Sequence, residues 1–328
     1  MKRPWGIIGC VFFFAGTVVW AGGIQAAEKY PVRPITFVVP LETGSGGDLT
    51  TRKLIEKASA ALGQPIMVVN KPGAASTIGY YQIHDAKPDG YTIGLGTATL
   101  VTNKLQGLFP YDYRDFTPIG TYYCWSSIIV ASTKSKRSFK TLAEAVSYAK
   151  SHPGEVSMAT AAVGQAQWIA AMAFIESTGV NFNVIPQEGV GGFTVTQVAG
   201  GHTDMGVLDF ASAKGQIDAK NIRILAVIGS KRIPPPYDSA PTLKESGYDA
   251  IWESFGMVMG PPKLPKEITG KLVSVFEAAV KDPEYEKFIT QRNSFRFYLP
   301  PDQIMKYCEE RQKAVQIIMQ KAGISKQK

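Results

Sequence analysis

The sequence is poor in the residues that build metal centres and disulfide frameworks. It has three cysteines and three histidines in 328 residues. Cys10 lies in an apolar N-terminal run, which leaves Cys124 and Cys308 for the body of the chain. Two cysteines cannot hold a structural metal by themselves, and the sequence does not show whether they come close enough to pair. We therefore expect no metal and no cofactor.

The usual patterns of catalytic residues are also missing. His84, His152 and His202 lie in turn-like contexts, and the sequence contains no Gly-x-Ser-x-Gly elbow. Glu42 and Asp48 share one loop and could form a carboxylate pair, but Asp48 stands where a helix N-cap is expected. We expect that the protein is not an enzyme.

Charge of one sign does not gather anywhere along the chain. Lysine and arginine number 35 against 27 acidic residues, which gives a net charge of +8. Loss of Lys2 and Arg3 with an N-terminal segment would leave +6 (8 − 2). No basic stripe with interleaved aromatic residues is present, so we expect no nucleic-acid partner. A modest positive field favours small anions.

Long apolar runs are missing after the N-terminus. Basic residues at 2–3 are followed by an almost wholly apolar run at 5–20, and small residues continue to Ala27. This order is typical of a secretory signal peptide, here residues 1–27, and we predict cleavage near Ala26 or Ala27. An uncleaved membrane anchor is the alternative, because the apolar run approaches spanning length. We expect a periplasmic protein.

What the sequence does contain is an alternation of short β-rich runs and helical segments, which predicts an α/β fold with a largely parallel sheet. One pattern occurs twice: strand, small-residue loop, helix, glycine stop, strand. The first copy is Ile35–Val39, Leu41–Gly47, Leu49–Leu62, Gly63 and Ile66–Val69. The second copy is Val156–Thr160, Ala161–Gln165, Gln167–Ser177, Gly179 and Phe182–Ile185. Two similar units predict two similar lobes.

The remaining segments suggest how the lobes are connected. We expect a helix at Ile78–Ala86, a strand at Tyr91–Leu95, and C-terminal helices at Ile268–Val280, Pro283–Gln291 and Pro301–Ala322. Apolar, strand-like runs at Ile119–Ala131 and Ile251–Gly260 would cross between the lobes. Two crossings make the first lobe discontinuous. We assign it residues 28–125 plus 255–328, with residues 126–254 as lobe two.

The loop Pro40–Asp48, PLETGSGGD, is the most informative stretch. A glycine-rich turn before a helix presents free backbone N–H groups and the positive end of the helix dipole, which together favour an anion. Thr43 and Ser45 can add hydroxyl donors. The loop is neither a Walker loop nor a dinucleotide fingerprint. The alternative is that the glycines only make a tight turn.

The loop Thr160–Trp168 repeats this arrangement with fewer hydroxyls. Its small residues allow close backbone approach, and Gln165 and Gln167 can form hydrogen bonds with a ligand. Trp168 could either line a pocket or pack in the core. Both loops follow strand ends, where ligands bind in open α/β sheets.

In their order and spacing, these segments resemble a solute-binding protein of the tripartite tricarboxylate transporter family, also called the Bug family. The resemblance covers nearly the whole mature chain. It rests on Tyr30–Ile35, the loop ending at Asp48, Gly63–Pro65, Asn70–Ala74, Ile78–Gly79, Pro88–Thr92, Pro110–Asp112, Asp115–Phe116 and Ala240–Thr242.

The resemblance implies a two-lobed periplasmic-binding-protein fold of type II-like architecture, with a small organic carboxylate held in the cleft between the lobes. It also implies a membrane transporter with a large and a small integral subunit as partner, and a monomeric binding protein. The implied first-lobe contacts are Leu41, Thr43, Gly44, Ser45, Gly46, Gly47, Asp48, Thr97, Ala98 and Thr99. The implied second-lobe contacts are Ala161, Ala162, Val163, Gly164 and Gln165, with Trp168, Asp209 and Phe210 close by.

The chain departs from the family pattern near the expected pocket, so we assign no particular acid. Glu42 and Thr43 replace proline and glycine, Gln165, Gln167 and Trp168 replace serines and a histidine, and Leu208 replaces an aspartate. Trp168 favours a ligand with an apolar or aromatic body, and Glu42 would repel a dense polycarboxylate. An extracytoplasmic sensor that passes its ligand signal to another protein is the alternative function.

Overall fold

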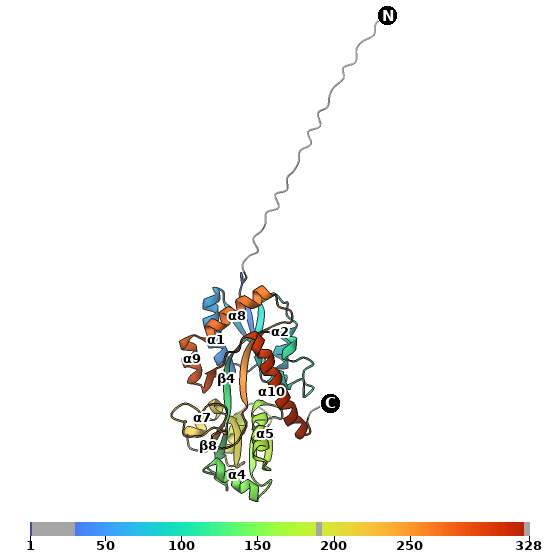
Figure 1. The fold of residues 1–328 in the computed structure, drawn as a ribbon. Coiled ribbons are helices and arrows are strands. Elements are labelled where there is room, and N and C mark those ends of the chain that lie inside the picture. Colours follow the sequence, from blue (N-terminus) through green and yellow to red (C-terminus); the bar gives the residue numbers. More distant parts are fainter. Residues whose placement is uncertain (2–29, 188–191, 325–328) are drawn as a thin grey trace.

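The computed structural model describes Met1 and residues 30–187 and 192–324 (Figure 1). The predicted signal peptide and its cleavage site fall on residues that lie outside this part. The strands are β1 (Ile35–Val39), β2 (Ile66–Asn70), β3 (Thr92–Thr97), β4 (Thr117–Ser132), β5 (Ser157–Ala161), β6 (Asn183–Gln187), β7 (Met205–Asp209), β8 (Ile222–Ile228), β9 (Glu253–Gly260) and β10 (Ser294–Arg296).

The helices are α1 (Gly46–Leu62), α2 (Thr77–His84), α3 (Thr99–Thr102), α4 (Leu142–Ser151), α5 (Ala166–Thr178), α6 (Gly192–Ala199), α7 (Phe210–Asp218), α8 (Lys266–Val280), α9 (Pro283–Thr290) and α10 (Pro301–Lys321). They include the six that the sequence predicts, together with α3, α4, α6 and α7, which it does not. Single 3-10 turns occur at Ala74–Ser76 and Tyr113–Asp115.

The strands form one mixed sheet in the order β2-β1-β3-β9-β4-β7-β5-β6, with β8 and β10 also paired to β4. The pairs β1–β2, β1–β3, β5–β6 and β5–β7 are parallel, as the alternation of strands and helices predicts. The long strand β4 and strand β9 instead pair antiparallel with their neighbours. The sheet is therefore parallel in its outer parts and antiparallel where the two parts join.

Strand β4 explains the elongated outline of the molecule in Figure 1. It is 16 residues long and pairs with β9 and β10 over one part of its length and with β7 and β8 over the other. Helices α1, α8 and α9 lie in the upper part of the figure, and α4 and α7 lie in the lower part. Helix α10 runs alongside the junction.

The start of α1 differs from the sequence prediction. Asp48 was expected as the N-cap, but the helix begins at Gly46 and Ser45 caps it, because the Ser45 hydroxyl accepts a hydrogen bond from the Asp48 amide at 3.3 Å. Gly63 ends the helix in the left-handed conformation with φ of 70°, as predicted. Gly179 ends α5 in the same way, with φ of 63°.

Three apolar clusters hold the elements together. One lies under α1, α8 and α9, and a smaller one lies under α6 and α7. The largest includes residues from α2, α3, α4 and α5 together with Ile304, Cys308, Val315 and Met319 of α10. Helix α10 therefore contributes to a core shared by both parts of the molecule. Cys124 and Cys308 are both buried and free.

Two negative findings apply to the described ranges 30–187 and 192–324. Within them, no helix combines the length and apolar character needed to cross a membrane. The same ranges hold no group of three or more histidine, cysteine or acidic side chains that could bind a metal ion.

Candidate functional site

The first loop connects β1 to α1, and the first amides of α1 point away from the helix. Within an α-helix the first N–H groups have no carbonyl partner in the preceding turn. At this end the Asp48 amide donates to Ser45 Oγ, and the Leu49 amide donates to the Ser45 carbonyl at 2.9 Å. The amides of Gly46 and Gly47 have no protein partner among the described residues. They are the donors that this loop can offer to an anion.

The carboxylate of Asp48 has a structural task in this loop. Its side chain has no exposed area, and Arg52 Nε donates to its two oxygens at 3.1 and 3.0 Å. Asn70 Nδ2 donates at 2.8 Å and the Gly44 amide at 2.9 Å. Burial opposes ionisation of Asp48, but the hydrogen bonds from Arg52, Gly44 and Asn70 outweigh it and lower the pKa. Asp48 thus holds the loop in shape and does not face a ligand.

Tyr123 of β4 reaches this loop from the middle of the sheet. Its ring lies over Gly256 of β9, where an added Cβ would come within 2.0 Å of Tyr123 Cε1. Its hydroxyl ends near Gly47, where an added Cβ would lie 2.9 Å from the Tyr123 oxygen. Thr97 pairs with Gly256 in register, so Thr97, Gly256 and Tyr123 form one row across β3, β9 and β4. The two glycines make room for the tyrosine.

The end of β3 carries a network of hydroxyl groups. The buried Tyr80 hydroxyl lies 2.9 Å from Thr97 Oγ1 and 2.7 Å from Thr99 Oγ1. It also accepts a hydrogen bond from the Thr97 amide at 3.2 Å. Burial raises the pKa of Tyr80 despite these bonds, so the phenol stays neutral. Tyr80 fixes the two threonines that the sequence placed in the site, whereas Ala98 between them is buried.

The second loop also ends at an open helix terminus. Gln165 occupies the N-cap position of α5 with extended backbone angles, and its side chain makes no capping hydrogen bond. The amides of Ala166, Gln167 and Trp168 find no partner within the described residues. Val163 beside them is 41% exposed. This loop therefore offers a full first turn of backbone donors.

Gln106 lies directly over the second loop. A Cβ added to Gly164 would come within 2.2–2.5 Å of three carboxamide atoms of Gln106. Gly164 has φ of 79°, a conformation that side chains other than glycine rarely adopt. Gln106 follows α3, outside both repeated units, so this contact joins the second loop to a distant segment of the chain. Nothing in the sequence indicates the contact between Gln106 and Gly164, because a lone glutamine in a turn is usually a surface residue.

Two of the predicted aromatic site residues pack in the core. Trp168 is 4% exposed and lies in the large apolar cluster. Ile169 and Phe174 belong to the same cluster. Phe210 is 5% exposed and meets Tyr237 edge to face, with ring centroids 4.9 Å apart.

Asp209 stands at the end of β7 and caps α7. Its Oδ1 accepts from the Ala211 amide at 3.3 Å and its Oδ2 from Ser212 Oγ at 3.1 Å. The residue keeps partial contact with solvent, yet protein surrounds it closely, and burial raises its pKa against these hydrogen bonds. Asp209 therefore lies in a recess, unlike the fully exposed Glu42 and Thr43 of the first loop.

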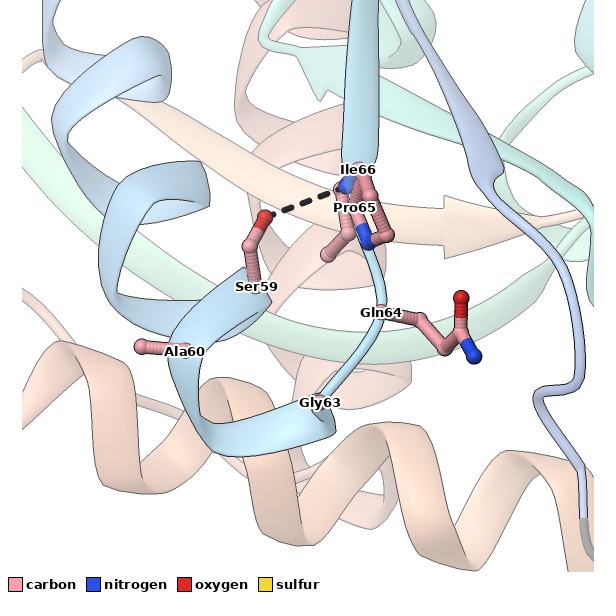
Figure 2. A pocket seen from close by; sticks show the side chains of 6 residues that line it. All are labelled: Ser59, Ala60, Gly63, Gln64, Pro65 and Ile66. Carbon is pink, nitrogen blue, oxygen red and sulfur yellow. Dashed lines mark hydrogen bonds between the residues drawn. The ribbon is translucent and has the colours of Figure 1, made fainter.

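The shallow hollow in Figure 2 lies at the opposite end of α1 from the first loop. Ser59 Oγ accepts a hydrogen bond from the Ile66 amide there at 3.1 Å, and Gln64 also lines the hollow. A second hollow lies between the start of α4 and β8, lined by Lys140, Arg223 and Tyr248 among others. Neither hollow lies at the carboxyl ends of β1, β3, β5 or β7, where the loops with open amides begin.

The three histidines have packing or surface roles. His84 stacks on Tyr111 with ring centroids 3.7 Å apart, and His152 stacks on Tyr148 at 4.2 Å. His202 is exposed. None lies at the strand ends that carry the candidate site.

The structure thus sorts the residues predicted from sequence. It places Gly46, Gly47, Thr97, Thr99, Gly164, Gln165 and Asp209 at or near the carboxyl ends of β1, β3, β5 and β7, and it buries Asp48, Ala98, Trp168 and Phe210. Tyr80, Gln106 and Tyr123 were missed. A signal for Tyr123 was present: Tyr123, Trp125 and Ser127 occupy alternate positions of a strand-like run, which places them on one face.

Comparison with known proteins agrees with the family resemblance of the sequence. The profile of the family described as "Tripartite tricarboxylate transporter family receptor" matches residues 50–324. The chain is 28% identical over 302 residues to a protein of Cupriavidus necator named for its position in the gbd 5' region. That match covers 92% of this chain and 90% of the relative.

Solved structures agree in fold. An R. palustris protein determined with adipate is 25% identical, with a TM-score of 0.78 over 90% of this chain and 99% of the other. MatC from Rhodopseudomonas palustris, determined with bound malate, has a TM-score of 0.71 at 22% identity, over 88% of this chain and 99% of MatC. Both show the α/β periplasmic-binding-protein fold. The chain therefore belongs to the tripartite tricarboxylate transporter family of receptors and is a solute-binding protein, not an enzyme.

Proposed function

We propose that this protein captures a small organic carboxylate between two lobes and delivers it to the integral subunits of a tripartite tricarboxylate-type transporter. The lobes are residues 28–125 plus 255–328 and residues 126–254. The protein would act in the periplasm after removal of residues 1–27. Closure of the lobes around the ligand would give the form that docks on the transporter.

The open helix ends are the observation on which the proposal depends. The amides of Gly46 and Gly47 at α1 and those of Ala166 and Gln167 at α5 have no partner among the described residues. Amide donors combined with the positive end of a helix dipole stabilise a carboxylate without a lysine or arginine. No cationic side chain lies in either loop.

The relatives support a carboxylate as the ligand class. One was solved with adipate and another with malate, both of which are small dicarboxylates. Neither ligand is transferred to this chain, because the two relatives are only 25% and 22% identical to it. The chemistry common to both ligands, a carboxylate group on a short carbon chain, is the part that we propose here.

Proline substitutions at the first helical position test the amides one at a time. Proline is favoured at this position and removes one N–H group with little cost to the fold. Ala166→Pro in α5 removes a proposed ligand donor, and Lys266→Pro at the first position of α8 is the matched control. A hydrogen bond to a charged group contributes about 1.5–3 kcal/mol, so Ala166→Pro should weaken carboxylate binding by about tenfold or more.

A thermal-shift screen against mono-, di-, tri- and aromatic carboxylates supplies the ligand for that test. At 100 times its dissociation constant a ligand stabilises by about 2.7 kcal/mol, a midpoint rise of at least about 2 °C here. The proposal fails if no carboxylate shifts the folded, ligand-free protein. It also fails if Ala166→Pro and Lys266→Pro bind the best carboxylate equally well.

A further inference from the structure

One face of the junction between the two parts carries polar groups that the proposed carboxylate site does not use. Tyr123, Trp125 and Ser127 occupy every second position along β4, so their side chains lie on the same face of the sheet. Ser254 of β9 pairs with Trp125, and Asp209 of β7 pairs with Ser127. Directly opposed residues point to the same side. We call these five side chains the crossing face.

Two hydroxyls of the crossing face are buried without a partner. Ser127 is 1% exposed and Ser254 is 5% exposed, and neither Oγ has a hydrogen-bond partner among the described residues. A buried polar atom left unpaired costs about 1–3 kcal/mol, so each such group in a native protein requires an explanation. A ligand or a water held beside it would supply the missing bond.

The carboxylate of Asp209 keeps free acceptor capacity. An ionised carboxylate has about four lone-pair sites, and α7 uses one on each oxygen, through Ala211 and Ser212. The other lone pairs remain for a donor outside the helix. Asp209 is paired with Ser127, which lies four residues along β4 from Tyr123 and on the same face, so the strand register places the phenol and the carboxylate on one face of the sheet.

Tyr123 connects this region to the carboxylate site. Its hydroxyl ends near Gly47, whose amide is one of the open donors of α1. A ligand carboxylate at the start of α1 would therefore lie beside the Tyr123 hydroxyl. The rest of that ligand would extend over the crossing face toward Asp209.

We propose that Asp209, with Ser127 and Ser254, forms a subsite for a hydrogen-bond donor on the ligand, so that the preferred ligands are hydroxy- or amino-carboxylates. This proposal depends on the proposed carboxylate-binding function. A carboxylate placed in this subsite would be repelled by Asp209, whereas a hydroxyl or ammonium group there can donate to it. Asp209 therefore selects ligands by whether they carry a hydrogen-bond donor, and not by their size.

Matched ligand pairs test the subsite by isothermal titration of the purified protein. Succinate, malate and aspartate share one carbon chain and differ in bearing no substituent, a hydroxyl or an ammonium group. We expect the better of the two substituted acids to bind at least tenfold more tightly than succinate. Asp209→Asn, which keeps an N-cap side chain for α7, should reduce this ratio below about threefold, because it removes the charged acceptor that distinguishes the substituted acids from succinate.

The controls separate this subsite from the carboxylate site. Glu42→Gln also removes an acid near the site, but from an exposed position, and it should leave the ratio intact. Equal weakening of succinate and the substituted acids by Asp209→Asn would overturn the subsite, as would a wild-type ratio near one. Binding of none of the three acids, or of any carboxylate in the wider screen, would overturn the carboxylate function itself.

Discussion

The two loops that precede α1 and α5 have the same pattern in the sequence but are stabilised by different means. The first is closed by its own side chains: Ser45 caps the helix, and Asp48 ties the loop to Arg52 and Asn70. The second has no side-chain cap at Gln165. It is held instead by contacts around it, with Gln106 over Gly164 and Trp168 in the core.

The comparison shows how one local pattern can be stabilised in two ways. In the first loop a buried charge network around Asp48 holds the backbone. In the second, Gln106 from outside the loop lies over Gly164. We therefore expect the proposed anion site at α1 to be preorganised and the one at α5 to respond to closure. The following predictions test this difference, from the largest effect to the smallest.

Removal of Asp48 should have the largest effect. Asp48→Ala leaves Arg52 and Asn70 without their buried acceptor, and we expect a loss of about 3 kcal/mol in the free energy of unfolding, measured in urea. Glu309→Ala removes the acid of an exposed i,i+4 pair with Lys313 and should leave stability nearly unchanged. A stable Asp48→Ala protein that no longer binds carboxylate would instead make Asp48 a ligand group.

Gly164→Ala should come next. The left-handed backbone alone costs about 1–2 kcal/mol for a residue with a Cβ, and the clash with Gln106 adds to it. Gly154→Ala is the matched control, since Gly154 has φ of 78° but only an ordinary contact at 3.6 Å. Gln106→Ala in the Gly164→Ala protein should remove the extra loss of stability relative to Gly154→Ala. If the extra loss remains, Gln106 does not position the second loop.

The pH dependence of stability should show the charge of Asp48 specifically. Its folded-state pKa lies below the unfolded value, so its contribution is complete above the unfolded pKa of about 3.9 and is lost as pH falls through the folded pKa. The stability advantage of the wild type over Asp48→Asn should therefore shrink as pH falls from about 5 toward 3. An advantage that stays constant over this range would mean that the hydrogen bonds, and not the charge, hold the loop.

The smallest effect should come from giving α5 the cap that α1 has. Gln165 has φ of −76° and ψ of 162°, close to the −63° and 159° of Ser45. Gln165→Ser should therefore cap α5 and stabilise the protein by about 0.5–1 kcal/mol. Because the new hydroxyl occupies one of the first amides, carboxylate affinity should fall. Gln167→Ser, inside the first turn, should leave both quantities unchanged.

Much of the fold could be predicted from the sequence because local signals agree with the tertiary structure. The strand at Ile35–Val39 and the glycine stops at Gly63 and Gly179 fall where predicted, since β-branched runs and left-handed caps are encoded locally. The antiparallel joining strands were not predicted as such. Pairing partners depend on residues far apart in the chain, and apolar runs do not reveal their direction.

The candidate site was predictable only in its backbone. Loops with glycine before a helix identified the donors at Gly46 and Gly47, because that arrangement is local. The side chains that complete the site are set by packing between distant segments. Tyr123 needs the space left by Gly256, and Gln106 needs the space left by Gly164. The prediction of Asp48 as the N-cap was wrong because the sequence does not show whether the helix begins after Ser45 or after Asp48.

The position of β9 has a consequence for the order in which the chain can fold. β9 lies between β3 and β4 in the sheet, although it follows both by a long stretch of sequence. A growing chain therefore cannot complete the sheet around β3 and β4 until Glu253–Gly260 has been synthesised. Helix α10 is synthesised later still. Such distant pairings also slow folding. For a protein exported as proposed here, this delay would keep the newly made chain unfolded long enough for translocation.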